Sequence, residues 1–261
     1  MSKRRSRKAP RAEHQLVYGR NPVLELLRAG WPVREVWVAT ETGEPRLRGI
    51  LNACVGLGIP VRRVTNRELS LRVGHADHQG VVAFVGQVKY ADLDAVFERA
   101  QAAGEPPFVA VLDSIQDPQN LGAILRSAEA AGVHGVIIPK RRAVGLTPAV
   151  AKASAGAFVH LPVVQVTNLV RTVLELKDAG LWIVAADQDG ETSLWEARLD
   201  GPLAVVVGSE GKGIHRLLRE TCDFTVRIPM LGKIESLNAS VAAALLFYEV
   251  RRRRTLVAAP R

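Results

Sequence analysis

Three short polar segments of this sequence combine side chains that can bind and orient a ligand. The first holds Asn120 and Arg126, which a helix would separate by about 120° around its axis, so that both can flank one groove. The second is the glycine-rich run 208–213, whose glycines let a ligand approach the backbone closely. The third carries Ser236 and Asn238 immediately before an apolar stretch. Each segment is a candidate wall of a binding pocket.

The glycine-rich run does not match the common nucleotide-binding loops. It reads Gly208-Ser-Glu-Gly-Lys-Gly213, in the order GxxGxG. This order lacks the GxxxxGK[ST] spacing of a Walker A loop and differs from the GxGxxG of dinucleotide-binding folds. The run therefore indicates a ligand loop without specifying the ligand, and Glu210 within it could equally be an exposed loop acid.

The same side chains also have ordinary structural explanations. Asn120 could cap the N-terminus of a helix, and Arg126 could face solvent on that helix. Ser236 and Asn238 are also of the residue types that cap helices. The residue types taken one at a time therefore leave ligand binding and simple structural roles both open.

The elements around these segments predict that they lie together. The apolar run 203–207 precedes the glycine-rich run, and a second buried run, 108–112, precedes the loop that leads to Asn120. A third short strand ends at Pro229, upstream of Ser236. Ligands of open α/β sheets bind beyond the carboxyl ends of the strands. We therefore expect the three segments to share one edge of a sheet.

Strands and helices alternate along the whole chain, which predicts two α/β domains with a largely parallel sheet, covered on both faces, in the second. Specific expectations in the second domain are a helix at 120–131, a helix at 147–156 and a strand at 159–164. The expected divisions are a disordered basic tail at 1–13, a β-α-β-α-β-α-β domain at 14–89, a linker at 90–107, a second domain at 108–254 and a tail at 255–261.

The net charge of +9 comes from the two ends of the chain. Residues 1–12 carry six basic side chains and residues 251–261 carry five, which leaves 24 basic and 26 acidic residues elsewhere. Basic tails bind polyanions by releasing counterions, without reading sequence. The tails therefore favour a nucleic-acid partner, although tails that only keep the protein soluble have the same composition.

Other features exclude several classes of protein. No apolar run approaches the roughly 20 residues that a membrane-spanning helix needs, and the basic N-terminus lacks the apolar core of a signal peptide. The two cysteines, Cys54 and Cys222, indicate free thiols in a reducing cytoplasm. The six histidines show no metal-binding spacing, so we expect no metal site.

Together, the three polar segments resemble the three motifs of the SpoU (TrmH) family of 2′-O-ribose RNA methyltransferases. A further resemblance links the N-terminal part to the small RNA-binding domain of the branch that methylates a guanosine ribose in the peptidyl-transferase loop of 23S rRNA. The matching stretches are Asn120-Leu-Gly-Ala-Ile-Leu-Arg126, Val207-Gly-Ser-Glu-Gly-Lys-Gly213, Ile228-Pro-Met with Ser236-Leu-Asn-Ala-Ser240, Tyr18-Gly-Arg-Asn-Pro-Val-Leu-Glu25 and His78-Gln-Gly-Val-Val-Ala83.

The resemblance implies an α/β fold in which a C-terminal trefoil-knotted SPOUT domain follows a small L30e-like RNA-binding domain. It implies that loops of the knot bind the methyl donor S-adenosylmethionine through Gly208, Ile228 and Leu237. It also implies a homodimer whose active site lies near the subunit contact. The C-terminal helix expected from Asn238 to about Arg253 is apolar all round in its first turns, which is consistent with such a contact.

The reaction implied is methyl transfer to a ribose 2′-hydroxyl without a metal, in which the family assigns the central role to Arg126. A guanidinium, with a pKa above about 12, is a poor base. Arg126 would either act with a substrate phosphate as the proton acceptor or stabilise the developing alkoxide. Holding the ribose and Arg126 in line with the methyl group would be the role of four further residues, Asn120, Glu210, Ser236 and Asn238.

Arg20, Arg62 and Arg63 of the N-terminal domain are expected to contact RNA phosphates. Other substrates fit the same chemistry, namely a guanosine ribose of tRNA, or an rRNA nucleotide whose methylation confers antibiotic resistance. A different class, a ribosome-associated RNA-binding protein without catalysis, would not need Arg126 together with Asn120, Glu210, Ser236 and Asn238. The sequence therefore favours an enzyme that acts on 23S rRNA in the cytoplasm.

Overall fold

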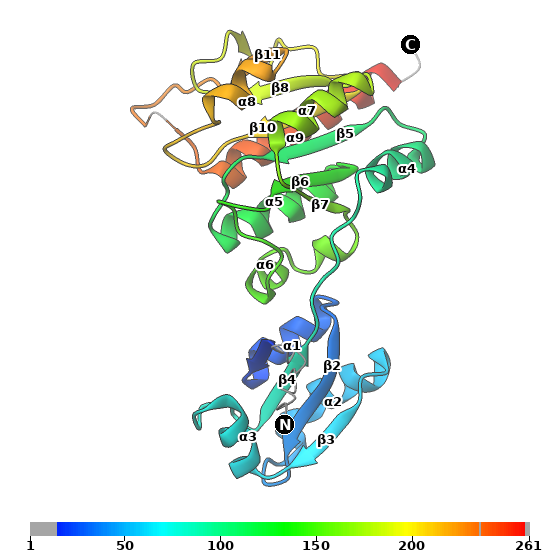
Figure 1. The fold of residues 1–261 in the computed structure, drawn as a ribbon, viewed down its shortest axis with the longest axis vertical. Helices are drawn as coiled ribbons and strands as arrows, with labels where there is room; N and C mark the ends of the chain where they lie inside the picture. Colours follow the sequence, from blue (N-terminus) through cyan, green and yellow to red (C-terminus); the bar gives the residue numbers. More distant parts are fainter. Residues whose placement is uncertain (1–14, 235, 259–261) are drawn as a thin grey trace, which may run out of the picture. The chain divides into compact units, whose positions relative to one another are not determined.

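The computed structural model describes residues 15–234 and 236–258, so the predicted tail at 1–13 lies outside the described residues. The chain forms two compact units that divide between Gln87 and Val88 (Figure 1). The expected linker 90–107 therefore belongs to the second unit, because it contains a helix, α4 (Asp94–Ala103), whose Val96 is fully buried there.

The first unit is a four-stranded sheet with helices on both faces. The strand order is β1-β4-β2-β3, in which β4 runs antiparallel to both neighbours while β2 and β3 are parallel. Leu69 of α3 packs on one face of the sheet, and α1 contacts α2. The elements are β1 (Gln15–Tyr18), α1 (Arg20–Arg28), β2 (Val33–Ala39), α2 (Glu44–Leu57), β3 (Val61–Val64), α3 (Asn66–Val73) and β4 (Val81–Val85).

The second unit is built on a seven-stranded sheet in which every pair is parallel. The strand order is β7-β6-β5-β10-β8-β11-β9. Its elements after α4 are β5 (Phe108–Leu112), α5 (Pro118–Ala130), β6 (Gly135–Pro139), α6 (Pro148–Ala153), the 3-10 turn η1 (Ala157–Val159), β7 (Val163–Val166), α7 (Leu169–Asp178), β8 (Trp182–Ala186), β9 (Thr192–Ser193), β10 (Leu203–Val207), α8 (Arg216–Thr221), β11 (Phe224–Arg227) and α9 (Ala239–Ala258).

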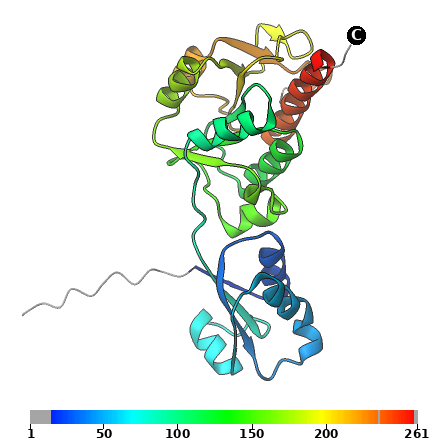
Figure 2. The same ribbon diagram turned by 90° about the vertical axis from the view of Figure 1, so that its right-hand side faces the viewer.

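Helices cover both faces of this sheet, as predicted. On one face, α4, α7 and α8 bury apolar side chains such as Val173 against the strands. On the other face, α5 and α9 lie side by side (Figures 1 and 2), and Phe247 of α9 meets Phe108 of β5 edge-on. Strands β5 and β10 are buried along their whole length. Nowhere in the described residues is a helix long and apolar enough to cross a membrane.

Three predicted boundaries in the second unit are wrong for local reasons. Helix α5 starts at Pro118 rather than at Asn120, because the Asp117 carboxylate caps it by accepting a hydrogen bond from Gln119 N–H. Helix α6 ends at Ala153 and the chain then takes positive φ angles of 49° at Ala155 and 85° at Gly156. The strand expected from residue 159 begins only at 163, because η1 occupies 157–159.

Candidate active site

The three polar segments converge at the carboxyl edge of the seven-stranded sheet. Because all strands are parallel, the loops that leave β5, β6, β10 and β11 emerge at the same edge. Strands β5 and β10 are direct neighbours, with Leu112 paired to Val207, although they lie far apart in the chain. The loop before α5 and the glycine-rich loop after β10 therefore meet, as the sequence predicts.

Asn120, Glu210 and Asn238 form a hydrogen-bonded network that joins the three segments. One carboxylate oxygen of Glu210 accepts hydrogen bonds from the side-chain amides of Asn120 (3.2 Å) and Asn238. It also accepts one from the backbone N–H of Ala239 at 3.1 Å. The Asn238 amide donates to the Asn120 side-chain oxygen at 2.9 Å. This closed triangle fixes three loops against one another.

Asn238 also begins α9, so its structural and site roles coincide. Its side-chain oxygen accepts hydrogen bonds from the backbone N–H groups of Ser240 (2.9 Å) and Val241 (3.4 Å), the arrangement of a helix N-cap. Its amide is then left to point toward Asn120 and Glu210. Helix capping and network formation are therefore not alternatives at this residue.

The glycine-rich loop needs glycine at several of its positions. Ser209 and Gly213 close the loop through two backbone hydrogen bonds of 3.2 and 2.9 Å. A Cβ at Gly208 would collide with the Gly213 backbone, and Gly211 has a φ of 77° that disfavours other residues. The loop therefore holds Glu210 in a fixed position in front of α5.

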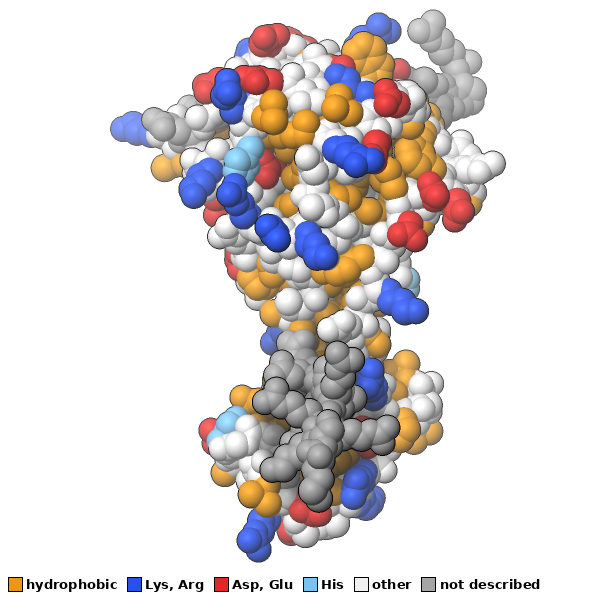
Figure 3. Space-filling view, viewed as in Figure 1, with side chains coloured by type: hydrophobic (Ala, Val, Ile, Leu, Met, Phe, Trp, Pro, Cys, Tyr) orange, Lys and Arg blue, Asp and Glu red, His pale blue; other side chains and the backbone are white. Residues whose placement is uncertain are grey.

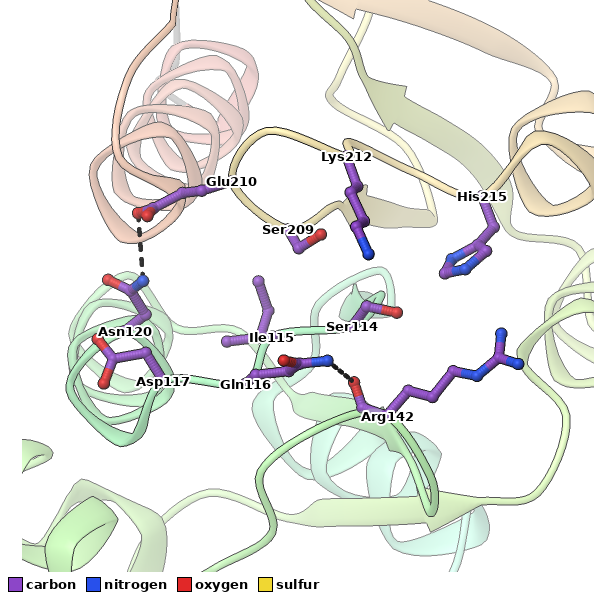
Figure 4. A pocket seen from close by; sticks show the side chains of 10 residues that line it. All are labelled: Ser114, Ile115, Gln116, Asp117, Asn120, Arg142, Ser209, Glu210, Lys212 and His215. Carbon is purple, nitrogen blue, oxygen red and sulfur yellow. Dashed lines mark hydrogen bonds between the residues drawn. The ribbon is translucent and has the colours of Figure 1, made fainter.

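A cavity of about 370 Å³ lies beside the network (Figure 4). Asn120 and Glu210 form one end of it, while Lys212, His215 and Arg142 surround the other end. The lining is completed by Ser114, Ile115, Gln116, Asp117 and Ser209. The cavity is therefore polar, with carboxylates at one end and basic groups at the other.

Asp113, the residue that follows β5, anchors His215 at this cavity. Its side chain is 6% exposed, and one carboxylate oxygen accepts hydrogen bonds from both the backbone N–H and the Nδ1 of His215, each at 2.8 Å. The Ser114 hydroxyl donates to the other oxygen at 3.0 Å. A buried carboxylate thus fixes the imidazole while half of that side chain stays exposed to the cavity.

A second, larger cavity of about 600 Å³ lies beyond the carboxyl end of β11. Ile228, Pro229 and Met230 supply an apolar wall, and Asp189 supplies a carboxylate. Its other lining residues are Gln188, Arg227, Gly232, Lys233 and Ile234. No group of three or more His, Cys, Asp or Glu that could hold a metal occurs within the described parts of the chain.

Not every expected site residue joins this arrangement. The side chain of Arg126 is exposed on α5, lines neither cavity and has no hydrogen bond or ion pair with a described residue. Ser236 is likewise exposed, and Leu237 is half-buried. Of the residues expected to bind the methyl donor, Ile228 lines the second cavity, whereas Gly208 and Leu237 line neither.

The arginines expected to contact RNA lie in the first unit and have different surroundings. The Arg62 guanidinium stacks over Trp37 at 4.9 Å from the ring centroid. Arg63 pairs with Glu44 at 2.8 Å, with both side chains more than half exposed. The Arg20 backbone N–H donates to the Gln79 side chain at 3.1 Å. Arg62 and Arg63 are exposed and Arg20 is half-buried, so each leaves surface available to a ligand.

Sequence reasoning missed Asp113, Arg142, Lys212 and His215 as residues of this edge. Asp113 carries a usable signal, because it is an acid directly after a buried strand. His215 carries none, since its role depends on β10 lying beside β5. Arg142 and Lys212 are exposed basic residues in loops, a pattern that is common on any protein surface.

Comparison with known protein families identifies both units. Residues 107–248 match the SpoU rRNA methylase family, and residues 16–91 match the domain described as RNA 2′-O ribose methyltransferase substrate binding. The chain is 46% identical over 245 residues to a TrmH-family tRNA/rRNA methyltransferase of Bacillus subtilis, covering 94% of this chain and 98% of that one. A Staphylococcus haemolyticus protein of the same description is 43% identical over 242 residues, covering 93% and 97%.

Solved structures agree with this assignment. The SpoU methyltransferase AviRb of Streptomyces viridochromogenes, solved with AdoMet, superimposes with a TM-score of 0.70 at 29% identity, covering 94% of this chain and 92% of that one. A TrmH/SpoU tRNA-modifying enzyme of A. aeolicus gives a TM-score of 0.52 at 26% identity and covers 62% of this chain and 85% of that one. This chain, with its motifs gathered at one sheet edge, belongs to the SpoU rRNA methylase family.

Proposed function

We propose that the protein transfers a methyl group from S-adenosylmethionine to a ribose 2′-hydroxyl of RNA, most specifically to a guanosine in the peptidyl-transferase loop of 23S rRNA. The Asn120–Glu210–Asn238 network carries the proposal. It brings together one residue of each of the three motifs in a preorganised arrangement of polar groups. A protein that only binds RNA has no need for such a network.

The second cavity is suited to the methyl donor. Its volume of about 600 Å³ lies within the range of small-ligand pockets, about 300–1,000 Å³. The apolar wall at Ile228 and Met230 can pack against the adenine ring, and the Asp189 carboxylate can accept hydrogen bonds from ribose hydroxyls. When bound, S-adenosylmethionine supplies the electrophilic methyl group. This assignment is supported by the structural neighbour AviRb, which was solved in complex with AdoMet.

Gly208 and Leu237 would contribute to donor binding through backbone groups, since neither places a side chain in that cavity. We also infer that the loop 228–238 and α9 form the trefoil knot of the family. This is supported by the way the segment before α9 returns to α5 and to the glycine-rich loop through Asn238. The knot would fix the loops without further cross-links.

Arg126 is the residue we propose to act on the 2′-hydroxyl, either by stabilising the alkoxide or together with a substrate phosphate. Its guanidinium is exposed and without a described partner, so it is available to a ligand. Along α5 it lies six residues from Asn120, about 9 Å at 1.5 Å per residue. No hydrogen bond among the described residues links it to the network of the same chain.

We infer that the protein is a homodimer that completes the site at Arg126. Helix α9 packs beside α5 and exposes Val241 (48%), Leu245 (38%) and Tyr248 (52%) at i, i+4 and i+7, which places them along one helix face. An apolar stripe of this kind is typical of a subunit contact. Sedimentation equilibrium should give twice the monomer mass of 28.3 kDa, and a monomer for Leu245→Arg.

The proposed rRNA substrate is supported by the family model that matches residues 107–248, which is described as an rRNA methylase. The A. aeolicus tRNA-modifying enzyme, in contrast, covers only 62% of this chain. The first unit would hold the RNA through Arg20, Arg62 and Arg63, and the six basic side chains of residues 1–12 would add sequence-independent attraction. Such a substrate also implies a cytoplasmic location.

The decisive experiment is methyl transfer from labelled S-adenosylmethionine to unmodified 23S rRNA and, separately, to unmodified tRNA, with the modified position mapped. Label on a guanosine of the peptidyl-transferase loop is the expected result. Label in tRNA alone would overturn the rRNA assignment while keeping the chemistry. Absence of saturable donor binding in calorimetry would remove the enzymatic assignment and favour a non-catalytic RNA-binding protein.

A further inference from the structure

Three basic side chains at the cavity beside the network take no part in the proposed chemistry. Lys212 and His215 reach into the cavity from the loop after β10, and Arg142 reaches it from the loop after β6 (Figure 4). Figure 3 shows basic side chains gathered beside a histidine on one face of this unit. We propose that Arg142, Lys212 and His215 form a binding site for a phosphodiester group of the RNA substrate, an inference that rests on the proposed function.

The charges of Arg142 and Lys212 are not neutralised by any residue that the structure describes. Neither side chain has a hydrogen bond or ion pair with a residue that the structure describes. The carboxylates at the same cavity are already engaged, because Glu210 accepts hydrogen bonds within the network and Asp117 caps α5. The basic end of the cavity is therefore free to attract an anion. The carboxylates at the acidic end are held by their own hydrogen bonds and do not pair with these basic groups.

The backbone that carries Arg142 is fixed against the loop after β5. Arg142 has a positive φ of 62°, a conformation that is uncommon for a residue with a side chain. Its carbonyl oxygen accepts a hydrogen bond from the Gln116 side chain at 3.4 Å, and the nearby Val144 N–H donates to Ile115 O at 2.9 Å. These contacts fix the backbone from which the Arg142 side chain extends to the cavity.

His215 is fixed more strongly still. Asp113 is buried, and one of its carboxylate oxygens accepts two hydrogen bonds from this residue. With Nδ1 donating to Asp113, Nε2 is the ring nitrogen left to meet a ligand, and it donates to a phosphate oxygen when the ring carries a proton on both nitrogens. The hydroxyls of Ser114 and Ser209 line the same cavity and can add hydrogen bonds to anionic oxygens. The site thus combines two free charges with oriented neutral donors, as phosphate groups require.

RNA chemistry explains why a phosphodiester is the expected occupant. In a ribose, the 2′-hydroxyl lies on the carbon next to the one that carries the 3′-phosphate. A ribose held at the Asn120–Glu210 end of the cavity therefore brings a phosphate toward the other end. The methyl donor carries one anionic group, its carboxylate, which could also use this site. If the donor carboxylate occupied this site, substitutions in it would lower the affinity for the donor rather than the affinity for RNA. The two affinities can be measured separately.

The test measures the affinity for an unmodified 23S rRNA transcript as a function of salt concentration, with saturating S-adenosylmethionine. Each phosphate contact contributes about 0.7 to 0.9 to the slope of log affinity against log salt. Arg142→Gln and Lys212→Gln should each lower the slope by about that amount and weaken binding roughly 5- to 10-fold at low salt. His215→Gln should weaken binding without changing the slope by as much.

Arg216→Gln is the matched control. It removes a charge one residue from His215, but this arginine pairs with Glu220 at 3.2 Å, is 87% exposed and does not line the cavity. Donor affinity, measured by calorimetry, should be unchanged in all four variants. An equal loss of slope in the Arg216 variant would show diffuse electrostatic attraction and overturn the site.

Two other results would also overturn the proposal. An unchanged slope in both the Arg142 and the Lys212 variants would show that neither contacts a phosphate. A large loss of donor affinity with an intact slope would assign the site to the donor carboxylate. Failure of the proposed function is seen separately in the wild-type protein. If that protein methylates only unmodified tRNA, the same slopes are measured with tRNA, and if it binds neither RNA, both proposals fall.

Discussion

Two clusters of basic side chains lie at opposite edges of the same seven-stranded sheet, and they are used differently. At the amino edge, Arg254 is buried and donates hydrogen bonds to the carbonyls of Pro106 (2.7 Å), Pro107 (3.0 Å) and Gly201 (2.8 Å). At the carboxyl edge, Arg142 and Lys212 have no such partners among the described residues. The first cluster joins chain segments together, and the second is open to a ligand.

The difference shows that pairing, rather than residue type, separates structural from functional cations. Arg251 forms an ion pair with Glu105 at 2.8 Å and donates hydrogen bonds to the carbonyls of Ala131 and Gly132. Its charge is therefore neutralised within the fold. Arg254 also lies 5.1 Å above the Phe108 ring. Both arginines belong to the C-terminal run that sequence reasoning assigned to a polyanion-binding tail. In the structure these two lie within α9 and tie it to the sheet.

The largest effect is expected at the functional side of this comparison. Arg126→Ala should lower methyl transfer by about a hundredfold to a thousandfold, because it removes a group that stabilises the developing negative charge. Folding and donor affinity should stay unchanged, since the side chain is exposed and has no described partner. Single-turnover assays with labelled donor measure the rate of methyl transfer. Urea denaturation measures the stability of the fold, and calorimetry measures donor affinity. Wild-type turnover would remove Arg126 from the mechanism.

The next effect falls on stability at the amino edge. Arg254→Ala should lower the free energy of unfolding by about 3 kcal/mol, because a buried guanidinium is removed and three partly buried carbonyl acceptors lose their donor. The measurement is the midpoint of urea unfolding at an unchanged slope. Arg171→Ala, which removes an 81% exposed partner of Glu175, is the control and should cost no more than about 0.5 kcal/mol. Equal effects would mean that burial of Arg254 contributes nothing.

The amino edge should also make stability depend on pH through His134. Burial lowers the pKa of His134 to about 4, opposed by Glu105 and assisted by Arg254, Arg251 and Arg99. Its Nδ1 accepts a hydrogen bond from Phe108 N–H at 3.0 Å, which requires the neutral ring. In the unfolded chain the pKa is about 6.5. The neutral form is therefore favoured by folding, and its stabilisation is complete above about pH 6.5.

As pH falls from about 6.5 to 4, the unfolded chain binds the proton first and stability declines by up to about 3 kcal/mol. The pKa of Glu105 is lowered by its hydrogen bond to Arg251, so this carboxylate adds a loss at lower pH. The difference between wild type and His134→Gln isolates the histidine, because glutamine does not titrate. A parallel pH profile in the two proteins would contradict this assignment.

Much of this architecture could be predicted because it depends on patterns of residues that are close together in the sequence. Continuous valine-rich apolar runs such as 108–112 and 203–207 are typical of buried strands, and their alternation with helices predicts a parallel sheet. Convergence of Asn120, Glu210 and Asn238 also follows, since all come after strand ends. The start of α5 was wrong because Asp117 and Asn120 are both capping residue types, and only the structure shows which one caps.

What could not be predicted depends on which strands are neighbours. Asp113 reaches His215 only because β10 inserts beside β5, and no local pattern specifies that strand order. The same holds for Arg254, whose partners precede β5 and β10. In both cases a charged residue looks exposed in the sequence and becomes buried or fixed through contacts more than 50 residues away.

The smallest effect sharpens the comparison most directly. Lys212→Gln should change the free energy of unfolding by less than about 0.5 kcal/mol, because the side chain is exposed and makes no described contact that folding would lose. Urea midpoints of this variant and of Arg254→Ala, measured side by side, compare one cation from each edge. A loss near that of Arg254→Ala would mean that Lys212 is part of the fold, and the open edge would then have only the charge of Arg142 to offer a phosphate. An unchanged midpoint together with a reduced salt slope for RNA would separate the two uses of a basic residue within one sheet.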